Sequence, residues 1–306
     1  MAEITAAMVK QLREQTGAGM MDVKRALTEA NGNMEEATKI LRMKGLASAA
    51  KKAGRVAAEG AVVAATEGKV GVLVEVNCET DFVGRTEQFR QFAEDVAKLI
   101  AKSKASNVEE LMNEKWAGSN ETVAQKTQSM VATVGENITV RRFVRYETAA
   151  NAALGTYIHA GGKIGVITEV VAQSGSPSDK SNELAREIAM HVAAAEPRFL
   201  SRDEVTQKDL DTERDIATEQ AAKSGKPANI IEKMVTGKME KFYGEACLLE
   251  QPYIRDDKST VTQHVEKTGK EHGCKYVVTR FTRYKLGEGI EKKSDDFAGE
   301  VAAAMR

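Results

Sequence analysis

The chain has 306 residues and a formal net charge of −1, with 44 lysines and arginines against 45 aspartates and glutamates. This length is sufficient for two or three domains, and the balanced charge argues against a protein that coats nucleic acid through excess positive charge. The three cysteines are far apart without CxxC spacing, so neither a disulfide framework nor a zinc site is predicted. No apolar run of about 18 residues and no signal-peptide pattern occur, so we expect a cytoplasmic protein without membrane contact.

Residues 1–45 have the pattern of a small helical module. Thr5 can cap a first helix, and Asn31-Gly32 is a typical end for a second. Asn33 stands at cap spacing before a third helix. This arrangement resembles a ubiquitin-associated (UBA-like) three-helix fold. Residues 46–60 are rich in alanine, lysine and glycine and are expected to form a linker.

A strand followed by a polar loop forms the centre of the chain. Val72–Val76 is rich in β-branched residues, as in a buried strand, and a helical pattern begins near Phe89. Asp81 and Phe82 therefore lie in a strand-to-helix loop, where scaffolds place functional groups. Two interpretations stay open. Thr80 or Asp81 caps the helix and Phe82 folds back on it as a staple, or the pair faces a partner.

An internal repeat organises the body of the chain. Gly68-Lys-Val-Gly-Val-Leu-Val-Glu-Val76 returns as Gly162-Lys-Ile-Gly-Val-Ile-Thr-Glu-Val170, and each copy precedes a helical pattern. The repeat predicts an α+β protein with two related subdomains, each with a small, mainly antiparallel sheet. The core N-subdomain is expected over 61–147 and the core C-subdomain over 148–200 and 244–290.

The segment between the two copies is expected to contain a helix and a strand. A helical stretch is predicted from about 108 to 131, and a strand from Ile138 to Tyr146. Arg141-Arg142 in this strand are interpreted as part of a solvated face.

Residues 201–243 are predicted to form a projecting antiparallel helical hairpin. Ser201 and Glu204 have the spacing of a capping box, and Gly225-Lys-Pro227 turns the chain. The apolar residues of both helices make only a narrow stripe, as on an arm. Residues 291–306 are expected to be a short C-terminal helical segment.

The chain shows no constellation that would carry catalysis. Neither GxxxxGK[ST] nor GxGxxG occurs, and no nucleophile–base pair or paired carboxylates can be named. His191 falls on an apolar helix face and is interpreted as a hydrogen-bonded core histidine. His159 lies in a glycine-rich turn and should be accessible to solvent or a partner. We therefore expect no enzyme, no cofactor and no bound metal.

These stretches together resemble the bacterial elongation factor Ts family, the guanine-nucleotide exchange factors for elongation factor Tu. The resemblance covers nearly the whole chain. In chain order, its motifs are Leu12-Arg-Glu-Gln-Thr-Gly-Ala-Gly-Met-Met-Asp22, Asn77-Cys-Glu-Thr-Asp-Phe-Val83, Val134-Gly-Glu-Asn-Ile138, Ile188-Ala-Met-His-Val-Ala-Ala194, Gly225-Lys-Pro227 and Gly287-Glu-Gly-Ile-Glu291.

The resemblance implies a role for the central loop. In this family the Thr-Asp-Phe-Val loop enters the nucleotide-binding domain of elongation factor Tu near the magnesium and phosphate site, displaces Mg²⁺ and promotes GDP release so that GTP can bind. It corresponds here to Thr80, Asp81, Phe82 and Val83. Further partner contacts are implied at Val134, Gly135, His159, Arg13 and Met20.

The partner implied is elongation factor Tu, both GDP-bound and free of nucleotide, with no direct contact to nucleic acid. A homodimer through the hairpin arm or the core stays open. Two functions from other classes compete with exchange: a non-catalytic binding scaffold that uses the UBA-like module, and a small-molecule enzyme with scattered site residues. The scaffold predicts that a Phe82→Ala protein behaves normally, and the enzyme predicts a ligand for the isolated chain.

Overall fold

The computed structural model describes residues 4–174 and 179–291 and divides the chain into two compact units. Unit 1 is built from stretches within 1–63, 74–143 and 285–306, and unit 2 from 64–73 and 144–284. The fold is α+β, as the sequence predicts. The predicted C-terminal helical segment falls almost entirely outside the described residues.

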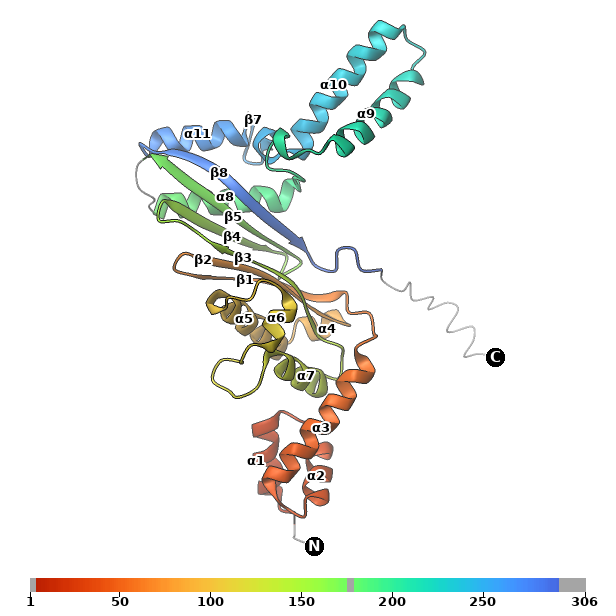
Figure 1. The fold of residues 1–306 in the computed structure, drawn as a ribbon, viewed down its shortest axis with the longest axis vertical. Helices are drawn as coiled ribbons and strands as arrows, with labels where there is room; N and C mark the ends of the chain where they lie inside the picture. Colours follow the sequence, from red (N-terminus) through yellow and green to blue (C-terminus); the bar gives the residue numbers. More distant parts are fainter. Residues whose placement is uncertain (1–3, 175–178, 292–306) are drawn as a thin grey trace, which may run out of the picture. The chain divides into compact units, whose positions relative to one another are not determined.

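Three helices form the N-terminal part of unit 1 (Figure 1): α1 (Ala6–Thr16), α2 (Met20–Glu29) and α3 (Met34–Lys52). Leu12 and Leu27 are among the fully buried residues of their common core. The predicted caps are present, since Thr5 accepts a hydrogen bond from the N–H of Met8 and Asn33 accepts from two N–H groups of α3. α3 continues beyond residue 45, so the first part of the expected linker is helical.

Two three-stranded sheets confirm the predicted repeat. Their strand orders are β1-β2-β3 and β4-β5-β8, so the two copies of the repeated motif, in β2 and β5, are both central strands. The bounds are β1 (Glu59–Glu67), β2 (Val70–Cys78), β3 (Thr139–Glu147), β4 (Ala152–His159), β5 (Ile164–Ser174) and β8 (Lys275–Lys285). β4 and β5 pair antiparallel from Ala152 opposite Val171 to His159 opposite Ile164.

The repeat also includes the third strand of each sheet. Val140-Arg-Arg-Phe-Val-Arg-Tyr146 in β3 resembles Val278-Thr-Arg-Phe-Thr-Arg-Tyr284 in β8. These copies were not recognised in the sequence because the helical hairpin is inserted before the second one. Each sheet is therefore built on the same plan, although the chain reaches its third strand by a different route.

Helices lie against the sheets (Figure 1). In unit 1 they are α4 (Asp81–Gly84), α5 (Glu87–Lys102), α6 (Val108–Asn113) and α7 (Val123–Val134). In unit 2, α8 (Asp179–Ala195) and α11 (Val261–Glu271) share a core with the sheet, whereas α9 (Gln207–Ala222) and α10 (Ala228–Ala246) form the hairpin that projects away from it. Unit 2 also contains the short strands β6 (Pro252–Tyr253) and β7 (Asp256–Thr260) and the 3₁₀ turns Arg202–Glu204 and Leu248–Glu250. α8 packs along β4 and β5. α5 buries the predicted apolar face, which includes Phe89 and Phe92.

The helical stretch expected over 108–131 is wrong as a single helix. A loop separates α6 from α7, and the N–H of Trp116 in this loop donates to the carbonyl of Glu121. The ring of Trp116 stacks on that of Phe92, with 5.5 Å between the centroids. Aromatic packing of the loop onto α5 therefore interrupts a segment whose local pattern is helical.

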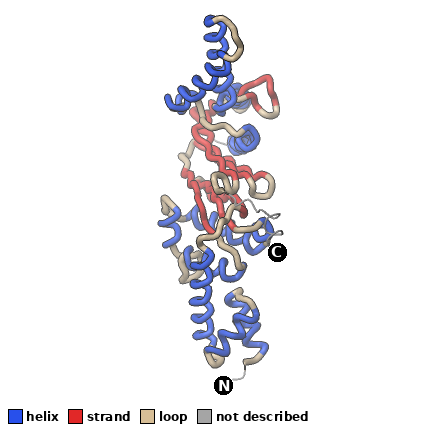
Figure 2. The backbone as a smooth tube through the Cα atoms, turned by 90° about the vertical axis from the view of Figure 1, so that its right-hand side faces the viewer, coloured by secondary structure: helices blue, strands red, loops and turns tan. Residues whose placement is uncertain are grey.

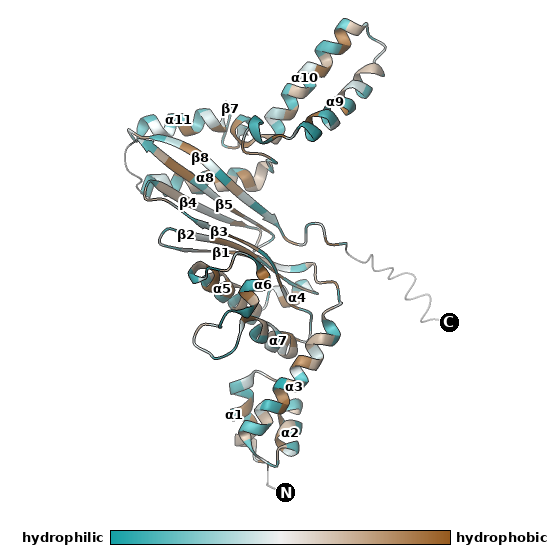
Figure 3. Ribbon diagram, viewed as in Figure 1, coloured by the Kyte–Doolittle hydropathy of each residue, from teal (hydrophilic) through white to brown (hydrophobic). Residues whose placement is uncertain are grey.

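The helical hairpin is confirmed, but its predicted start is wrong. Ser201 makes no capping bond, and the Glu204 carboxylate accepts instead from the N–H of Leu200 at 2.6 Å. α9 begins at Gln207 with Thr206 as its cap. Figure 2 shows the hairpin as two helices joined by a loop, and Figure 3 shows hydrophilic and hydrophobic residues mixed along both helices.

A buried carboxylate, Glu75, connects the segments of unit 1. Its side chain is fully buried in β2 and forms ion pairs with Arg141 and Arg142 of β3, at 3.0 and 2.6 Å. It also accepts from the N–H of Gly287 at 2.8 Å and from the Asn77 amide at 3.1 Å. The expectation of a solvated face at Arg141-Arg142 is therefore wrong, because a charge buried in an apolar strand needs charged partners.

The same arrangement occurs in unit 2. Glu169 occupies the position of Glu75 in the repeated motif and forms an ion pair with Arg280 of β8 at 2.8 Å.

Burial alone would raise the pKa of the Glu75 carboxyl, but the donors from Gly287, Arg142, Arg141 and Asn77 together hold it below the usual value.

His191 is the fully buried histidine that the sequence predicts. Its Nε2 lies 2.9 Å from the amide oxygen of Gln251, and its Nδ1 accepts from the N–H of Ile254 at 3.2 Å. Burial lowers the pKa of this imidazole, the Gln251 hydrogen bond opposes that shift, and the charge of His264 adds to it. The fold therefore holds His191 neutral.

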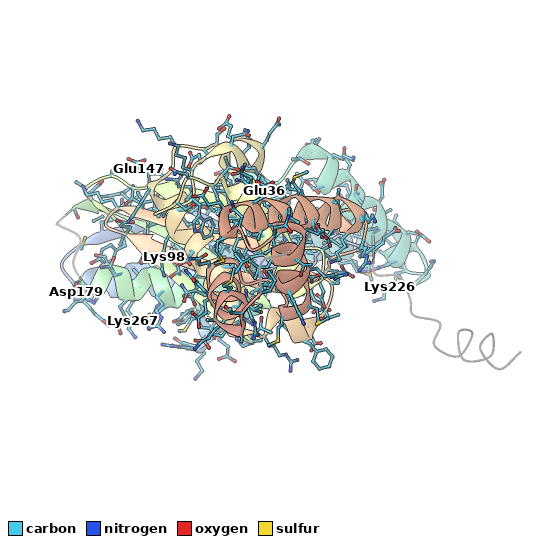
Figure 4. The ribbon with its side chains drawn as sticks, turned by 90° about the horizontal axis from the view of Figure 1, so that it is seen from below. Glu36, Lys98, Glu147, Asp179, Lys226 and Lys267 are labelled. Carbon is cyan, nitrogen blue, oxygen red and sulfur yellow. The ribbon has the colours of Figure 1, made fainter. Side chains whose placement is uncertain are left out.

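Charges of both signs are spread over the surface. Figure 4 labels six exposed examples from different elements, namely Glu36, Lys98, Glu147, Asp179, Lys226 and Lys267. Among the described residues, no helix is long and apolar enough to cross a membrane.

Replacement of Glu75 by alanine is expected to destabilise unit 1 by about 3–5 kcal/mol, because it leaves the charges of Arg141 and Arg142 without their buried partner. Urea unfolding followed by the fluorescence of Trp116, the single tryptophan, measures this effect within unit 1. Glu94→Ala, at an exposed position of α5, is the matched control and should leave the midpoint almost unchanged. Equal midpoints for the two variants would contradict the assigned role of Glu75.

His191 should make unit 2 less stable in acid. Because its pKa in the folded state is depressed, its contribution is fully present above the unfolded value of about 6.5 and is lost as the pH falls from there toward the folded value. Thermal unfolding followed by circular dichroism between about pH 5 and 8 measures this dependence. His191→Gln should flatten it, whereas substitution of the exposed His159 should not.

Candidate functional site

Two loop segments meet at one end of the first sheet. Residues 79–83 follow β2 directly, and residues 134–137 precede β3, the neighbouring strand. Glu75 contacts Arg141 while Glu79, four residues later, contacts Asn137, four residues earlier. The two strands therefore run antiparallel, and the end of β2 lies beside the start of β3.

Two glutamates cross between these segments in a reciprocal arrangement, which we call the Glu79–Glu136 clasp. One carboxylate oxygen of Glu136 accepts from the N–H groups of Glu79 and Thr80, at 3.1 and 3.0 Å, and the other accepts from the Thr80 hydroxyl at 2.6 Å. In return, the Glu79 carboxylate accepts from the N–H of Asn137 at 2.6 Å. The clasp thus joins the loop after β2 to the turn before β3.

The loop after β2 also packs against the backbone of strand β1. A Cβ at residue 84 would lie 3.1 Å from the Cα of Gly60, closer than ordinary van der Waals contact, so the absence of a side chain lets the short α4 turn sit close against the β1 backbone. Arg90 of α5 donates to the Gly84 carbonyl at 2.7 Å. The buried thiol of Cys78 donates to the Thr80 carbonyl. Burial, with the charges of Glu136 and Glu59, raises the pKa of this thiol to about 12, so it is not a nucleophile.

The loop itself exposes an aromatic side chain. Thr80 caps α4, its hydroxyl accepting from the N–H of Val83 at 3.4 Å, so the capping interpretation holds for this residue. Phe82 is 81% exposed, and the interpretation of a staple on the helix is wrong. Asp81 is half-buried and pairs with Arg85 at 2.7 Å on the surface. A large apolar ring thus projects from a loop that is held on three sides.

The structure brings several of the other predicted residues into recognisable groups. Val134 is the last residue of α7, and Gly135 is its left-handed cap, so both adjoin the clasp. In the helical module, Arg13 and the 58% exposed Met20 line the same hollow. His159 is exposed at the end of β4 in unit 2, where the hydroxyl of Tyr157 lies 3.1 Å from its Nδ1.

Sequence reasoning missed Glu79 and Glu136. Both stand inside the motifs Asn77-Cys-Glu-Thr-Asp-Phe-Val83 and Val134-Gly-Glu-Asn-Ile138, but their contact depends on strand pairing. The available signal was a glutamate just after the first strand pattern, at Glu79, and another just before the next strand pattern, at Glu136. Among residues 4–174 and 179–291, no group of three or more His, Cys, Asp or Glu side chains could hold a metal ion.

Comparisons with known proteins agree on one family. The sequence model of the family described as Elongation factor TS matches residues 79–288. Elongation factor Ts of Syntrophotalea carbinolica is 50% identical over 304 residues, covering 99% of this chain and all of that protein. Elongation factor Ts of Trichlorobacter lovleyi is 47% identical, with 98% of each chain covered, and that of Clostridium botulinum is 48% identical, with 99% of each covered.

Truncation of Phe82 should not destabilise the protein, because its ring is almost fully exposed. Phe89, seven positions later in α5, is fully buried and is the matched control. Phe89→Ala should cost about 3–5 kcal/mol and Phe82→Ala less than about 0.5 kcal/mol in urea unfolding. A large loss of stability in Phe82→Ala would mean that the ring packs on the fold.

Proposed function

Because the chain belongs to the elongation factor Ts family, we propose that it is a cytoplasmic translation elongation factor that binds elongation factor Tu–GDP and exchanges its guanine nucleotide. The observation that carries the proposal is the exposed Phe82 on a loop that the clasp, Gly84 and Cys78 hold in place. Exposed aromatic rings on rigid supports are typical anchors of protein interfaces.

Phe82 supplies the apolar part of the interaction. Full burial of this ring in a crevice of the partner would gain about 1.5–3 kcal/mol. If the crevice exists only when the nucleotide site is open, this gain stabilises the open state alone and shifts the partner toward it. This mechanism converts binding energy into nucleotide release and requires no catalytic residue in this chain.

Asp81 supplies the polar part. Its pair with Arg85 lies at the surface, where ion pairs contribute little, so its carboxylate is available to groups of the partner. Engagement of groups that support Mg²⁺ would loosen the ion that neutralises the nucleotide phosphates. Displacement of Mg²⁺ followed by GDP release would then leave the site free for GTP.

The effects of factor and nucleotide on each other must be equal. If the factor weakens GDP binding by a given ratio, GDP weakens binding of the factor by the same ratio. A thousandfold change corresponds to about 4 kcal/mol.

We propose that Thr80, Val83, Val134 and Gly135 extend the contact around Asp81 and Phe82, and that Arg13, Met20 and His159 add contacts elsewhere.

One observation favours the alternative of a binding scaffold. Met20 and Met21 in α2 are 58% and 67% exposed and lie over one hollow of the helical module, which suits an apolar partner. A scaffold of this kind would bind without accelerating nucleotide release. The same experiment therefore decides between the two functions.

Release of a fluorescent GDP from purified elongation factor Tu tests the proposal. The wild-type chain should accelerate release, and Asp81→Ala and Phe82→Ala should each lower this acceleration by about tenfold or more, since each removes contacts made in the open state. Ile254→Ala, an exposed apolar truncation in unit 2, is the control and should have little effect. Tight binding without acceleration by the wild type would favour the scaffold, and the absence of both binding and acceleration would contradict the exchange function.

A further inference from the structure

We infer that Glu136 is a positioning residue for nucleotide exchange, which presents Asp81 and Phe82 by fixing the α4 turn from the neighbouring strand. The inference rests on the proposed function and assigns a role to a residue that makes its contacts within this chain. Glu79 completes the arrangement from the opposite side.

The α4 turn needs support from outside itself. It comprises only Asp81–Gly84, a single turn, and one turn fixes several dihedral angles for one or two hydrogen bonds. Its cap bond from Val83 to Thr80 is long, at 3.4 Å. Because Phe82 is 81% exposed, packing of its ring does not fix the turn either.

Glu136 supplies this support through the cap residue. A hydroxyl group has one hydrogen to donate and two lone pairs. Thr80 donates its hydrogen to Glu136 at 2.6 Å, which turns a lone pair toward the N–H of Val83. The same carboxylate accepts from the N–H groups of Glu79 and Thr80. Glu136 therefore sets both the backbone entry to α4 and the orientation of its cap.

Glu136 is itself held by its neighbours. Gly135 before it ends α7 with φ of 86°, and Asn137 after it is fixed by the Glu79 carboxylate and by the carbonyl of Arg55, to which its amide donates at 2.8 Å. Each segment thus supplies a carboxylate that accepts hydrogen bonds from the backbone of the other segment. This reciprocity makes the loop and the turn around Gly135 one rigid surface.

A rigid surface favours exchange because the cost of ordering the loop is met before the partner binds. Without the clasp, Phe82 would sample orientations that do not enter the crevice, and contacts at Val134 and Gly135 would no longer be in register with it. A displacement of about 1 Å at a reacting or wedging group can lower a rate by about a hundredfold.

The test compares variants of the full chain in GDP release from elongation factor Tu. Glu136→Ala should lower the acceleration by about tenfold to a hundredfold. Glu136→Gln keeps one acceptor oxygen for the two N–H groups and should restore most of the activity. Glu110→Ala is the matched control, because Glu110 accepts from the N–H and hydroxyl of Ser106 in the same way but lies in α6. It should behave as the wild type.

Two further measurements separate positioning from a general loss of structure. Amide hydrogen exchange at Glu79 and Thr80 should become faster in Glu136→Ala but not in Glu110→Ala, while Trp116 fluorescence stays native in both. In a mutant cycle, Glu136→Ala should have little effect once Asp81 and Phe82 are both alanine, since it acts through these two side chains.

The outcomes are distinguishable. No acceleration by the wild type overturns the proposed function and the inference with it. Acceleration by the wild type and equal acceleration by Glu136→Ala overturns the inference alone. Losses that add when Glu136→Ala is combined with alanine at both Asp81 and Phe82 also overturn it, because they mean that Glu136 does not act through these side chains.

Discussion

A buried negative charge in the middle of the first sheet is the constraint on which the rest of unit 1 depends. The carboxylate of Glu75 can stay in an apolar strand only if charged and polar donors surround it, and these come from β3 and from the chain after β8. The contacts fix how β2 lies against β3. The candidate loop begins at Glu79, four residues after Glu75. The same register therefore brings Glu79 to Asn137 and Thr80 to Glu136.

This strand register produces the candidate site, which is a hydrogen-bonded loop that carries the exposed ring of Phe82. Soluble proteins usually cover rings as large as that of Phe82, and here the backbone below it is fixed by hydrogen bonds instead of by packing of the ring. That combination suits a surface that must enter another protein: the apolar area remains available and little ordering is left to be done on binding. Under the proposed function, the contacts of a few loop residues on a generic α+β frame carry the activity.

The internal repeat shows the difference between frame and function. Glu75 with Arg142, and Glu169 with Arg280, form equivalent ion pairs in the two sheets. After β2 the chain continues as Glu79-Thr-Asp-Phe82, whereas no Asp-Phe pair follows the equivalent strand β5 in the sequence. The same sheet is thus used twice, but only the first copy of the repeated strand is followed by an Asp-Phe pair in the sequence. Duplication of the frame does not require duplication of the site.

The sequence by itself determined the features that depend on neighbouring residues. The caps at Thr5 and Asn33, the amphipathic face of α5, the two copies of the repeated strand and the burial of His191 could all be predicted, because their signals lie within a few residues or in the order of elements. The loop at Asp81 and Phe82 was also found, although capping and exposure could not be separated there.

Only the tertiary structure decided which charged residues pair and which apolar residue stays uncovered. The sequence pattern of Arg141 and Arg142 is that of surface charges, and only the pairing of β3 with β2 brings them to Glu75. Likewise, the hydrogen bond from Thr80 to Glu136 joins residues 56 positions apart. The start of α9 and the break between α6 and α7 were likewise settled by contacts to Leu200 and Phe92. Local patterns describe burial and helix ends, but partners across a sheet are set by strand register, which no short stretch of sequence contains.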